Sequence, residues 1–249
     1  MNAIISQIHS ELLKNADEKV AQSMQRFFKE EIKSIGLKAK TVGTIAKSAY
    51  KDYLKNADKT TVYAVAEKLM QSPFIEEISI GIHFVIFSEK LYEKNDIKIF
   101  EHWIETYITN WATCDSFCNH AVGVLVERFP ENIKTLKRWS KSKNIWLRRT
   151  SAVSLIVPSR KGLFFDDILE IAETLLLDEE DMVQKGYGWL LKTSSLTESF
   201  VKADTATKEK HFKSVFNFVM KHKAVIPRTS LRYAIEKFPE KERKLCMAK

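Results

Sequence analysis

Apolar residues recur at helical spacing along almost the whole chain. Residues three and four positions apart share one face of an α-helix, so a stripe at i, i+3, i+4 and i+7 predicts an amphipathic helix. One such stripe consists of Val62, Val65, Ala66, Leu69 and Met70, and another of Phe212, Val215, Phe216 and Val219. The pattern predicts about twelve helices and no strand. Ile78–Phe87 is rich in β-branched and aromatic residues, but helical patterns flank it, and we expect a buried helix there.

Five prolines divide this helical pattern. The residue before a proline is pushed out of the α region, so each X-Pro pair marks an expected helix boundary. The pairs are Ser72-Pro73, Phe129-Pro130, Val157-Pro158, Ile226-Pro227 and Phe238-Pro239.

Four of the more apolar segments share a layout in which a polar or charged opening precedes an apolar run. They align with steps of 34, 36 and 43 residues on Asp115, Arg149, Lys185 and Arg228. Two-helix HEAT repeats have a period of about 40 residues, and their second helices line a concave surface. The sequence therefore predicts an all-α, single-domain curved solenoid of HEAT-like two-helix repeats over residues 1–249, with these four residues along its inner wall. The alternative is an ordinary helical domain whose segments share only amphipathicity.

Composition narrows the class of protein. The 7 glycines and 5 prolines are too few for an all-β fold, which needs a turn signal about every 8–12 residues. A hydrophobic content of 45% argues against a disordered chain. No apolar run approaches the roughly 18 residues of a membrane span, Met1–Asn15 lacks a secretory-signal pattern, and three cysteines do not make a disulfide framework. We expect a soluble protein of a reducing compartment, the cytoplasm.

The formal net charge of +8 is unevenly distributed. Residues 208–249 hold 12 basic and 4 acidic residues, so this part alone contributes 12 − 4 = +8. A second basic cluster lies in the neutral remainder and contains Lys134, Lys137, Arg138, Lys141, Lys143, Arg148 and Arg149. Such clusters are typical of proteins that bind a polyanion, because neutralising phosphates releases counterions. Each cluster alone is also compatible with a solvated helix face. Together they favour a nucleic acid as the partner. A curved, basic inner wall fits a DNA duplex by shape and charge, so we expect double-stranded DNA as the partner and a location at the nucleoid.

Aromatic residues accompany three of the aligned openings. Trp111 and Asp115 are four residues apart and share one helix face if both are helical. Trp146 precedes Arg149 by three residues, and Trp189 follows Gly186-Tyr187-Gly188. Each glycine inside a helix costs about 0.5–1 kcal/mol relative to alanine. We therefore expect another helix or a ligand to approach closely at these two glycines.

These segments resemble the DNA alkylation-repair glycosylases of the AlkD type. The similar stretches are residues 27–32, 110–116, 144–149, 184–189 and 232–237, so the resemblance covers nearly the whole chain. It implies a HEAT-like solenoid that wraps duplex DNA and excises cationic alkylated purines, notably N3-alkyladenine and N7-alkylguanine. It also implies that Asp115 is the active-site aspartate, that Trp111 and Trp189 flank the sugar, and that Arg149 holds the phosphate.

The chain departs from that family at two positions. Relatives carry a tyrosine at the position of Phe27, so a DNA-facing hydroxyl is absent here and Phe27 is expected to contact DNA through its ring alone. Asn110 replaces a second aromatic residue of some members. The further residues expected to contact DNA are Arg148, Lys185 and Arg228, from the basic cluster and the aligned openings.

A single carboxylate is enough for such a reaction. Glycoside hydrolysis ordinarily uses two carboxyl groups, one of which protonates the leaving group. A purine alkylated at N3 or N7 already carries a positive charge and leaves as a neutral base. Asp115 then needs only to stabilise the oxocarbenium-like sugar and position a water, and the electron-rich faces of Trp111 and Trp189 add to that stabilisation. We expect a monofunctional glycosylase that acts as a monomer, without a cofactor and without a deep base-flipping pocket.

Other functions receive less support. Cys114, Cys118 and His120 form C-x3-C-x-H, which lacks the second ligand pair of a zinc site, so no metal is expected. No phosphate-binding, dinucleotide-binding or zincin motif occurs. The alternative function is a non-catalytic HEAT-like module that binds DNA structures or a protein partner, since helical solenoids host many binding roles.

Overall fold

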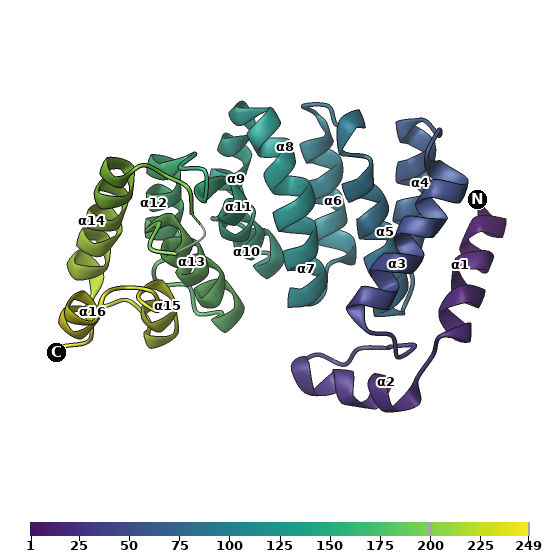
Figure 1. The fold of residues 1–249 in the computed structure, drawn as a ribbon, viewed down its shortest axis with the longest axis horizontal. Coiled ribbons are helices and arrows are strands. Elements are labelled where there is room, and N and C mark those ends of the chain that lie inside the picture. The colour runs from purple at the N-terminus through teal and green to yellow at the C-terminus, as the bar shows by residue number, and fades with distance from the viewer. Residues whose placement is uncertain (199–200, 249) are drawn as a thin grey trace. The chain divides into compact units, whose positions relative to one another are not determined.

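A computed structural model describes residues 1–198 and 201–248. The described residues form sixteen α-helices joined by short turns and no strand beyond an isolated bridge between Lys33 and Phe74 (Figure 1). The all-α class is thus confirmed, whereas the expected number of about twelve helices was too low. One reason is the π turn Cys118–Val122, which divides a longer helical stretch into two α-helices. No helix in this part of the chain is long and apolar enough to cross a membrane.

The contacts group the chain into two compact units. Unit 1 comprises Met1–Asp96 and Thr106–Phe117, and unit 2 comprises Ile97–Glu105 and Cys118–Lys249. The expectation of one domain over residues 1–249 stays a prediction, and residues 199–200 and 249 of that range lie outside the described residues.

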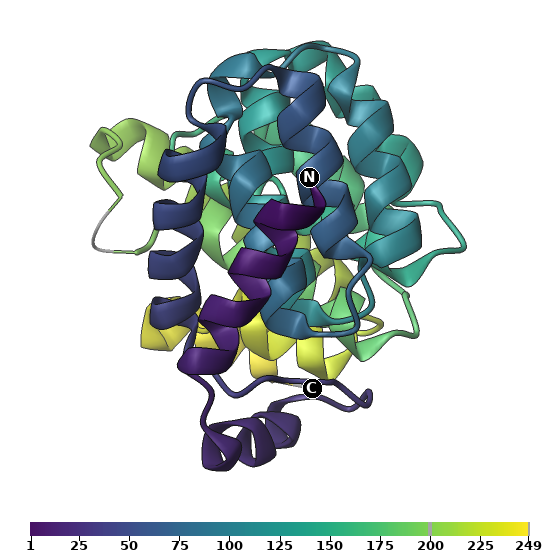
Figure 2. The ribbon, with the colours of Figure 1, turned by 90° about the vertical axis from the view of Figure 1, so that its right-hand side faces the viewer.

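Unit 1 is a layer of helices with one irregular segment attached. Its helices are α1 Asn2–Lys14, α2 Glu18–Met24, α3 Ala39–Ala49, α4 Lys59–Met70, α5 Ile75–Phe87 and α7 Trp111–Phe117. Helix α1 runs alongside α3 in both views (Figures 1 and 2), while α2 lies beyond one end of α1 and α3. A 3₁₀ turn, Gln25–Phe27, and an extended stretch connect α2 to α3.

Helix α5 is the centre of unit 1, and it contains the predicted buried helix Ile78–Phe87. Ile80, Ile82 and Phe84 have no exposed surface, and the stripe on α4 packs against α5. Gly81 permits this packing, because a Cβ atom there would lie only 2.6 Å from the Ala66 carbonyl oxygen. Apolar burial of this kind is the main stabilising term in a helical layer.

The first turn of α5 also carries a buried carboxylate that holds the irregular segment in place. Glu76 is only 2% exposed and accepts hydrogen bonds from the Ser34 hydroxyl (2.6 Å) and from the backbone N–H groups of Ile35 (3.0 Å), Gly36 (2.9 Å) and Leu37 (3.2 Å). Gly36 has φ +99°, a left-handed conformation that favours glycine. Such a fully paired carboxylate ties residues 34–37 to α5.

Unit 2 holds the remaining helices. They are α6 Asp96–Tyr107 for most of its length, α8 Gly123–Arg128, α9 Ile133–Trp139, α10 Ile145–Val153, α11 Ile156–Ser159, α12 Phe165–Thr174, α13 Asp181–Ser194, α14 Thr205–His222, α15 Arg228–Ala234 and α16 Glu240–Met247. Four of the five proline boundaries fall between helices as predicted, but Pro158 lies inside the short α11. Proline is tolerated there because the N–H groups of a first helical turn have no intrahelical partner.

The two glycines of α13 lie where other helices approach closely, as expected. A Cβ atom on Gly186 would lie 3.3 Å from Val153 and 3.4 Å from the Arg149 guanidinium, both on α10. A Cβ atom on Gly188 would lie 2.8 Å from the Ser230 carbonyl oxygen and 2.8 Å from the Tyr233 Cβ, both on α15. Helix α13 is therefore packed between α10 and α15 at glycine contacts.

The repeat alignment agrees with the helix boundaries at three of its four positions. Asp115, Arg149 and Lys185 are each the fifth residue of their helices, α7, α10 and α13. Arg228 is instead the first residue of α15, whose fifth residue is Arg232. The expected equivalence of Arg228 is therefore wrong by about one helical turn.

We predict opposite effects of alanine at two helix glycines. In Gly43→Ala the new Cβ meets only the His83 Nε2, at 3.7 Å, so the free energy of unfolding should rise by about 0.5–1 kcal/mol. In Gly188→Ala the overlap with Ser230 and Tyr233 should lower it by about 1–3 kcal/mol. Chemical denaturation of both variants tests this. An unfolding midpoint of Gly188→Ala equal to that of the wild type would contradict the close packing of α13 on α15.

Candidate functional site

Trp111 is held in a fixed position by the segment that follows α2. It is the first residue of α7, and its indole Nε1 donates a hydrogen bond to the Phe27 carbonyl oxygen (3.0 Å). The Phe28 ring stacks on the indole with a centroid separation of 5.5 Å and an interplanar angle of 21°. The structure thus brings two predicted residues, Phe27 and Trp111, together within unit 1.

The segment that holds Trp111 is itself fixed by the side chain of Gln25. Its Nε2 donates to the carbonyl oxygens of Phe28 (3.3 Å) and Glu30 (2.8 Å), and its Oε1 accepts from the Ile32 N–H (3.0 Å). Phe27 is nevertheless 72% exposed. A rigid backbone therefore presents an exposed aromatic ring, which is compatible with the expected DNA contact of Phe27.

Asp115 lies one helical turn beyond Trp111 on α7 and is half-buried. The four-residue separation places both side chains on one face of the helix, as expected. Asn110 starts this helix: its Oδ1 accepts from the Thr113 N–H (3.0 Å), and the residue is 3% exposed. Asparagine at this position thus has a structural use as a helix cap.

A cavity of about 310 Å³ adjoins Trp111 within unit 1. Phe27, Phe28 and Trp111 supply aromatic walls, and the polar side chains Ser79, His83 and Ser116 also line it. Neither Phe28 nor His83 was expected at the site. Phe28 could have been predicted, because it adjoins Phe27 in the sequence. His83 could not, because it is one of six scattered histidines.

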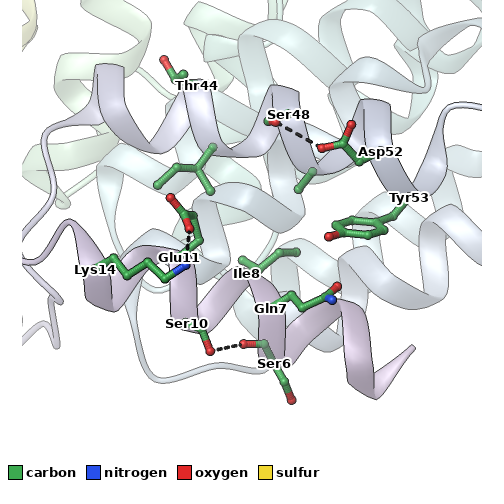
Figure 3. Close-up of a pocket in the computed structure, with 12 residues that line it drawn as sticks. Ser6, Gln7, Ile8, Ser10, Glu11, Lys14, Thr44, Ser48, Asp52 and Tyr53 are labelled. Atoms are coloured by element: carbon green, nitrogen blue, oxygen red, sulfur yellow. Dashed lines mark hydrogen bonds and ion pairs between the residues drawn. The ribbon is translucent and has the colours of Figure 1, made fainter.

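A larger cavity of about 580 Å³ lies between α1 and α3, far along the sequence from Trp111 and Asp115 (Figure 3). Two pairs of its polar side chains bond each other. Lys14 pairs with Glu11 (3.1 Å), and Ser48 donates to Asp52 (3.2 Å). None of the predicted site residues lines this cavity.

Arg149 of unit 2 is buried rather than exposed. Only 5% of the residue is accessible, it packs against Gly186, and its guanidinium donates to the Met182 carbonyl oxygen. The glycine on α13 thus makes room for the guanidinium. Its expected phosphate contact stays a prediction.

Arg148 has an internal role that the sequence analysis missed. Its Nε donates to Asp178 (2.6 Å), a second guanidinium nitrogen donates to the same carboxylate (3.3 Å), and a third donates to the carbonyl oxygens of Ser142 and Lys143 (both 3.0 Å). Asp178 belongs to the acidic run that follows α12. These bonds fix the α9–α10 connection and use the donors that a phosphate would need.

Other members of the basic cluster are paired in the same way. Arg138 makes two 2.7 Å hydrogen bonds to Glu101, and these bonds raise the pKa of Arg138. Lys137 contacts Asp167 (2.7 Å) and Glu170 (2.5 Å), which raise its pKa. Lys185 pairs with Asp181 at 2.6 Å, one turn earlier on α13. Carboxylates of unit 2 thus partly neutralise the positive charge of these residues.

Trp189 and Arg228 are the remaining predicted residues. Trp189 is half-buried on α13, one turn after Lys185, and the neighbouring Gly188 packs on α15. Tyr187 is fully buried and donates to the Leu176 carbonyl oxygen (2.9 Å); burial raises its pKa to about 12. Arg228 is exposed at the start of α15. Among the predicted cations of unit 2, Arg228 is therefore the one most accessible to a phosphate.

Comparison with known proteins identifies the family and the fold. Residues 8–238 match the family model described as DNA alkylation repair enzyme. The fold is similar to that of a solved structure, a predicted DNA alkylation repair enzyme from Enterococcus faecalis, with a TM-score of 0.75, 15% sequence identity, and coverage of 91% of this chain and 98% of that chain. No curated protein matches the chain in sequence. The helical-repeat fold is thereby shown.

We predict that Gln25→Ala loosens the segment that holds Trp111. Loss of three hydrogen bonds should lower the local stability by about 1–3 kcal/mol and speed amide exchange at Ile32 by about fivefold or more. Hydrogen–deuterium exchange measures this. The matched control is Gln22→Ala, because Gln22 bonds only the exposed Glu18 side chain (3.1 Å). Equal exchange at Ile32 in both variants would show that Gln25 does not fix the segment.

Proposed function

The chain belongs to the DNA alkylation repair enzyme family, and from this premise we propose that it is a monofunctional DNA glycosylase. The proposed reaction is hydrolysis of the N-glycosidic bond of cationic alkylated purines, N3-alkyladenine and N7-alkylguanine, in duplex DNA.

The observation that carries the proposal is the pairing of Asp115 with a fixed aromatic ring. Trp111 lies one turn before Asp115 on α7, and the Phe27 carbonyl oxygen and the Phe28 ring hold its indole. A carboxylate and an oriented electron-rich face on one side of a helix suit a developing positive charge. A protein that only binds DNA gains nothing from a carboxylate facing phosphates, because like charges repel.

The reaction balances with one carboxylate. The bond between C1′ and the purine nitrogen breaks, and its electron pair neutralises the cationic base, which leaves without needing a proton. Asp115 stabilises the oxocarbenium-like sugar electrostatically, and Trp111 and Trp189 present their ring faces to it. A water then adds to C1′ and gives its proton to Asp115.

Selectivity in this mechanism comes from the leaving group. A neutral base needs a general acid at the purine, and Asp115 acts on the sugar instead. A cationic base is already activated, so hydrogen bonds to base edges are not required for discrimination. Electrostatic attraction to the duplex comes from Arg228 and Arg149, and the exposed ring of Phe27 adds an uncharged contact.

We predict that Asp115→Asn lowers release of N7-methylguanine from duplex DNA by about 100-fold or more, since a fixed charge at a reacting centre is worth that much. Single-turnover base release measures it. The matched control is Asp52→Asn, because Asp52 is exposed and bonds only Ser48. Equal rates for Asp115→Asn and the wild type would exclude Asp115 as the catalytic carboxylate. DNA binding without base release by the wild type would favour the non-catalytic module instead.

We further predict that two arginines affect different properties. Arg228→Ala should reduce the slope of log affinity against log salt by about 0.9, with stability unchanged, because one phosphate contact is lost. Arg148→Ala should instead lower the free energy of unfolding by about 3 kcal/mol, since it leaves Asp178 without this partner. Salt-dependent DNA binding and denaturation of both variants check this. Identical salt slopes for Arg228→Ala and the wild type would remove Arg228 from the DNA contact.

A further inference from the structure

The cavity beside Trp111 has unused hydrogen-bonding groups in an otherwise apolar lining. Phe27, Phe28 and Trp111 form its aromatic side, and buried apolar residues of α3 and α5, Val42 and Ile75, lie among the rest. Its volume of about 310 Å³ is at the lower end of the range for small-molecule sites. The proposed hydrolysis uses one face of Trp111 but assigns nothing to this cavity.

His83 supplies one of these unused groups. Its Nδ1 lies 2.7 Å from the Ser79 carbonyl oxygen, an acceptor, so the proton of the neutral imidazole resides on Nδ1 and Nε2 keeps a lone pair. No described residue donates to that Nε2. Gly43 leaves space around it, because a Cβ atom at residue 43 would stay 3.7 Å away. His83 therefore offers an acceptor for an N–H group of a ligand.

The other polar groups of the lining differ in how far they are satisfied. The Glu76 carboxylate is saturated by its four donors, and the Ser79 hydroxyl donates to the Ile75 carbonyl oxygen (2.7 Å). The hydroxyl of Ser116, half-buried on α7, has no partner among the described residues and can donate or accept. One acceptor and one hydroxyl thus remain for a ligand.

The charges of the lining exclude several ligands. No lysine or arginine lines the cavity, and Glu76 contributes a negative charge, so a phosphate-bearing ligand has no partner there. A purely aliphatic ligand would leave His83 and Ser116 unpaired, which is unfavourable. A neutral, planar nitrogen heterocycle needs no cationic partner and leaves neither His83 nor Ser116 unpaired. It stacks on aromatic rings and carries N–H and ring-nitrogen groups at its edge.

We propose that this cavity binds a free, neutral purine base, which contacts the stacked pair of Phe28 and Trp111 from outside and donates an N–H to the His83 Nε2. That the natural ligand is the alkylated base released from DNA rests on the proposed function. The ligand is the free base and not a nucleotide extruded from the duplex, so the expected absence of a deep base-flipping pocket is untouched. Occupancy of this site would make the released base an inhibitor that competes for the face of Trp111.

The test is a titration of the purified full chain with 7-methylguanine, followed by tryptophan fluorescence and calorimetry. We expect one site per chain, quenching of the emission that is lost in Trp111→Phe, and an affinity at least tenfold weaker in His83→Leu. Ser116→Ala should weaken binding several-fold, whereas Ser48→Ala, outside the cavity on α3, should not. 7-Methylguanosine 5′-monophosphate and toluene should both bind at least tenfold more weakly than the free base.

Three results would overturn the proposal: no binding of 7-methylguanine at millimolar concentration, the same affinity in His83→Leu and the wild type, or toluene binding as tightly as the base. If His83→Leu does not fold, Ser116→Ala and the ligand comparison decide alone. The titration needs no catalysis, so its outcome is independent of the proposed function. Base binding without release from DNA would support the site and contradict the glycosylase, and release without base binding would do the reverse.

Discussion

The arrangement around Trp111 depends on the buried carboxylate of Glu76. Its four hydrogen bonds attach residues 34–37 to the first turn of α5, the most deeply buried helix of unit 1. The segment between α2 and α3 has no regular secondary structure after Phe27 to hold it, so polar contacts must do so. Removing such an acceptor would leave the N–H groups of Ile35 and Leu37 unpaired, and each unpaired buried N–H costs about 1–3 kcal/mol. Next to these anchored residues, the Gln25 side chain holds the backbone of residues 28–32. The Phe27 carbonyl oxygen in turn holds the Trp111 indole.

In unit 2, helix packing rather than a buried carboxylate holds the predicted site residues in position. Glycines 186 and 188 let α13 approach α10 and α15, which buries the stem of Arg149 and orients the next residue of α13, Trp189. The guanidinium of Arg148 then ties α10 to the acidic run before α13. Two arginines from the two basic clusters thus differ in role, since Arg148 stabilises the fold and Arg228 stays exposed.

Local features of the sequence predicted a large part of the structure. The stripe on α4, the buried helix around Ile82, four of the five proline boundaries and the close approach at Gly186 and Gly188 all follow from short-range rules and are confirmed. The position of Arg228 failed, because α14 has 18 residues whereas α12, which precedes α13, has 10, and the longer helix lengthens the last repeat. The partners of Glu76 and Arg148 were not foreseeable in this way. Glu76 bonds residues about 40 positions away and Arg148 bonds one 30 positions away, and no local pattern encodes such pairs.

In the proposed mechanism the protein hydrolyses the bond between the sugar and a base that is already cationic. It uses one carboxylate and no general acid to protonate the purine. The most direct measurement compares two duplexes of one sequence that carry either N7-methylguanine or the neutral lesion hypoxanthine at the same position. The proposed mechanism predicts single-turnover release of the cationic base and no measurable release of hypoxanthine under the same conditions. Release of both bases at similar rates would contradict it, and so would release of neither.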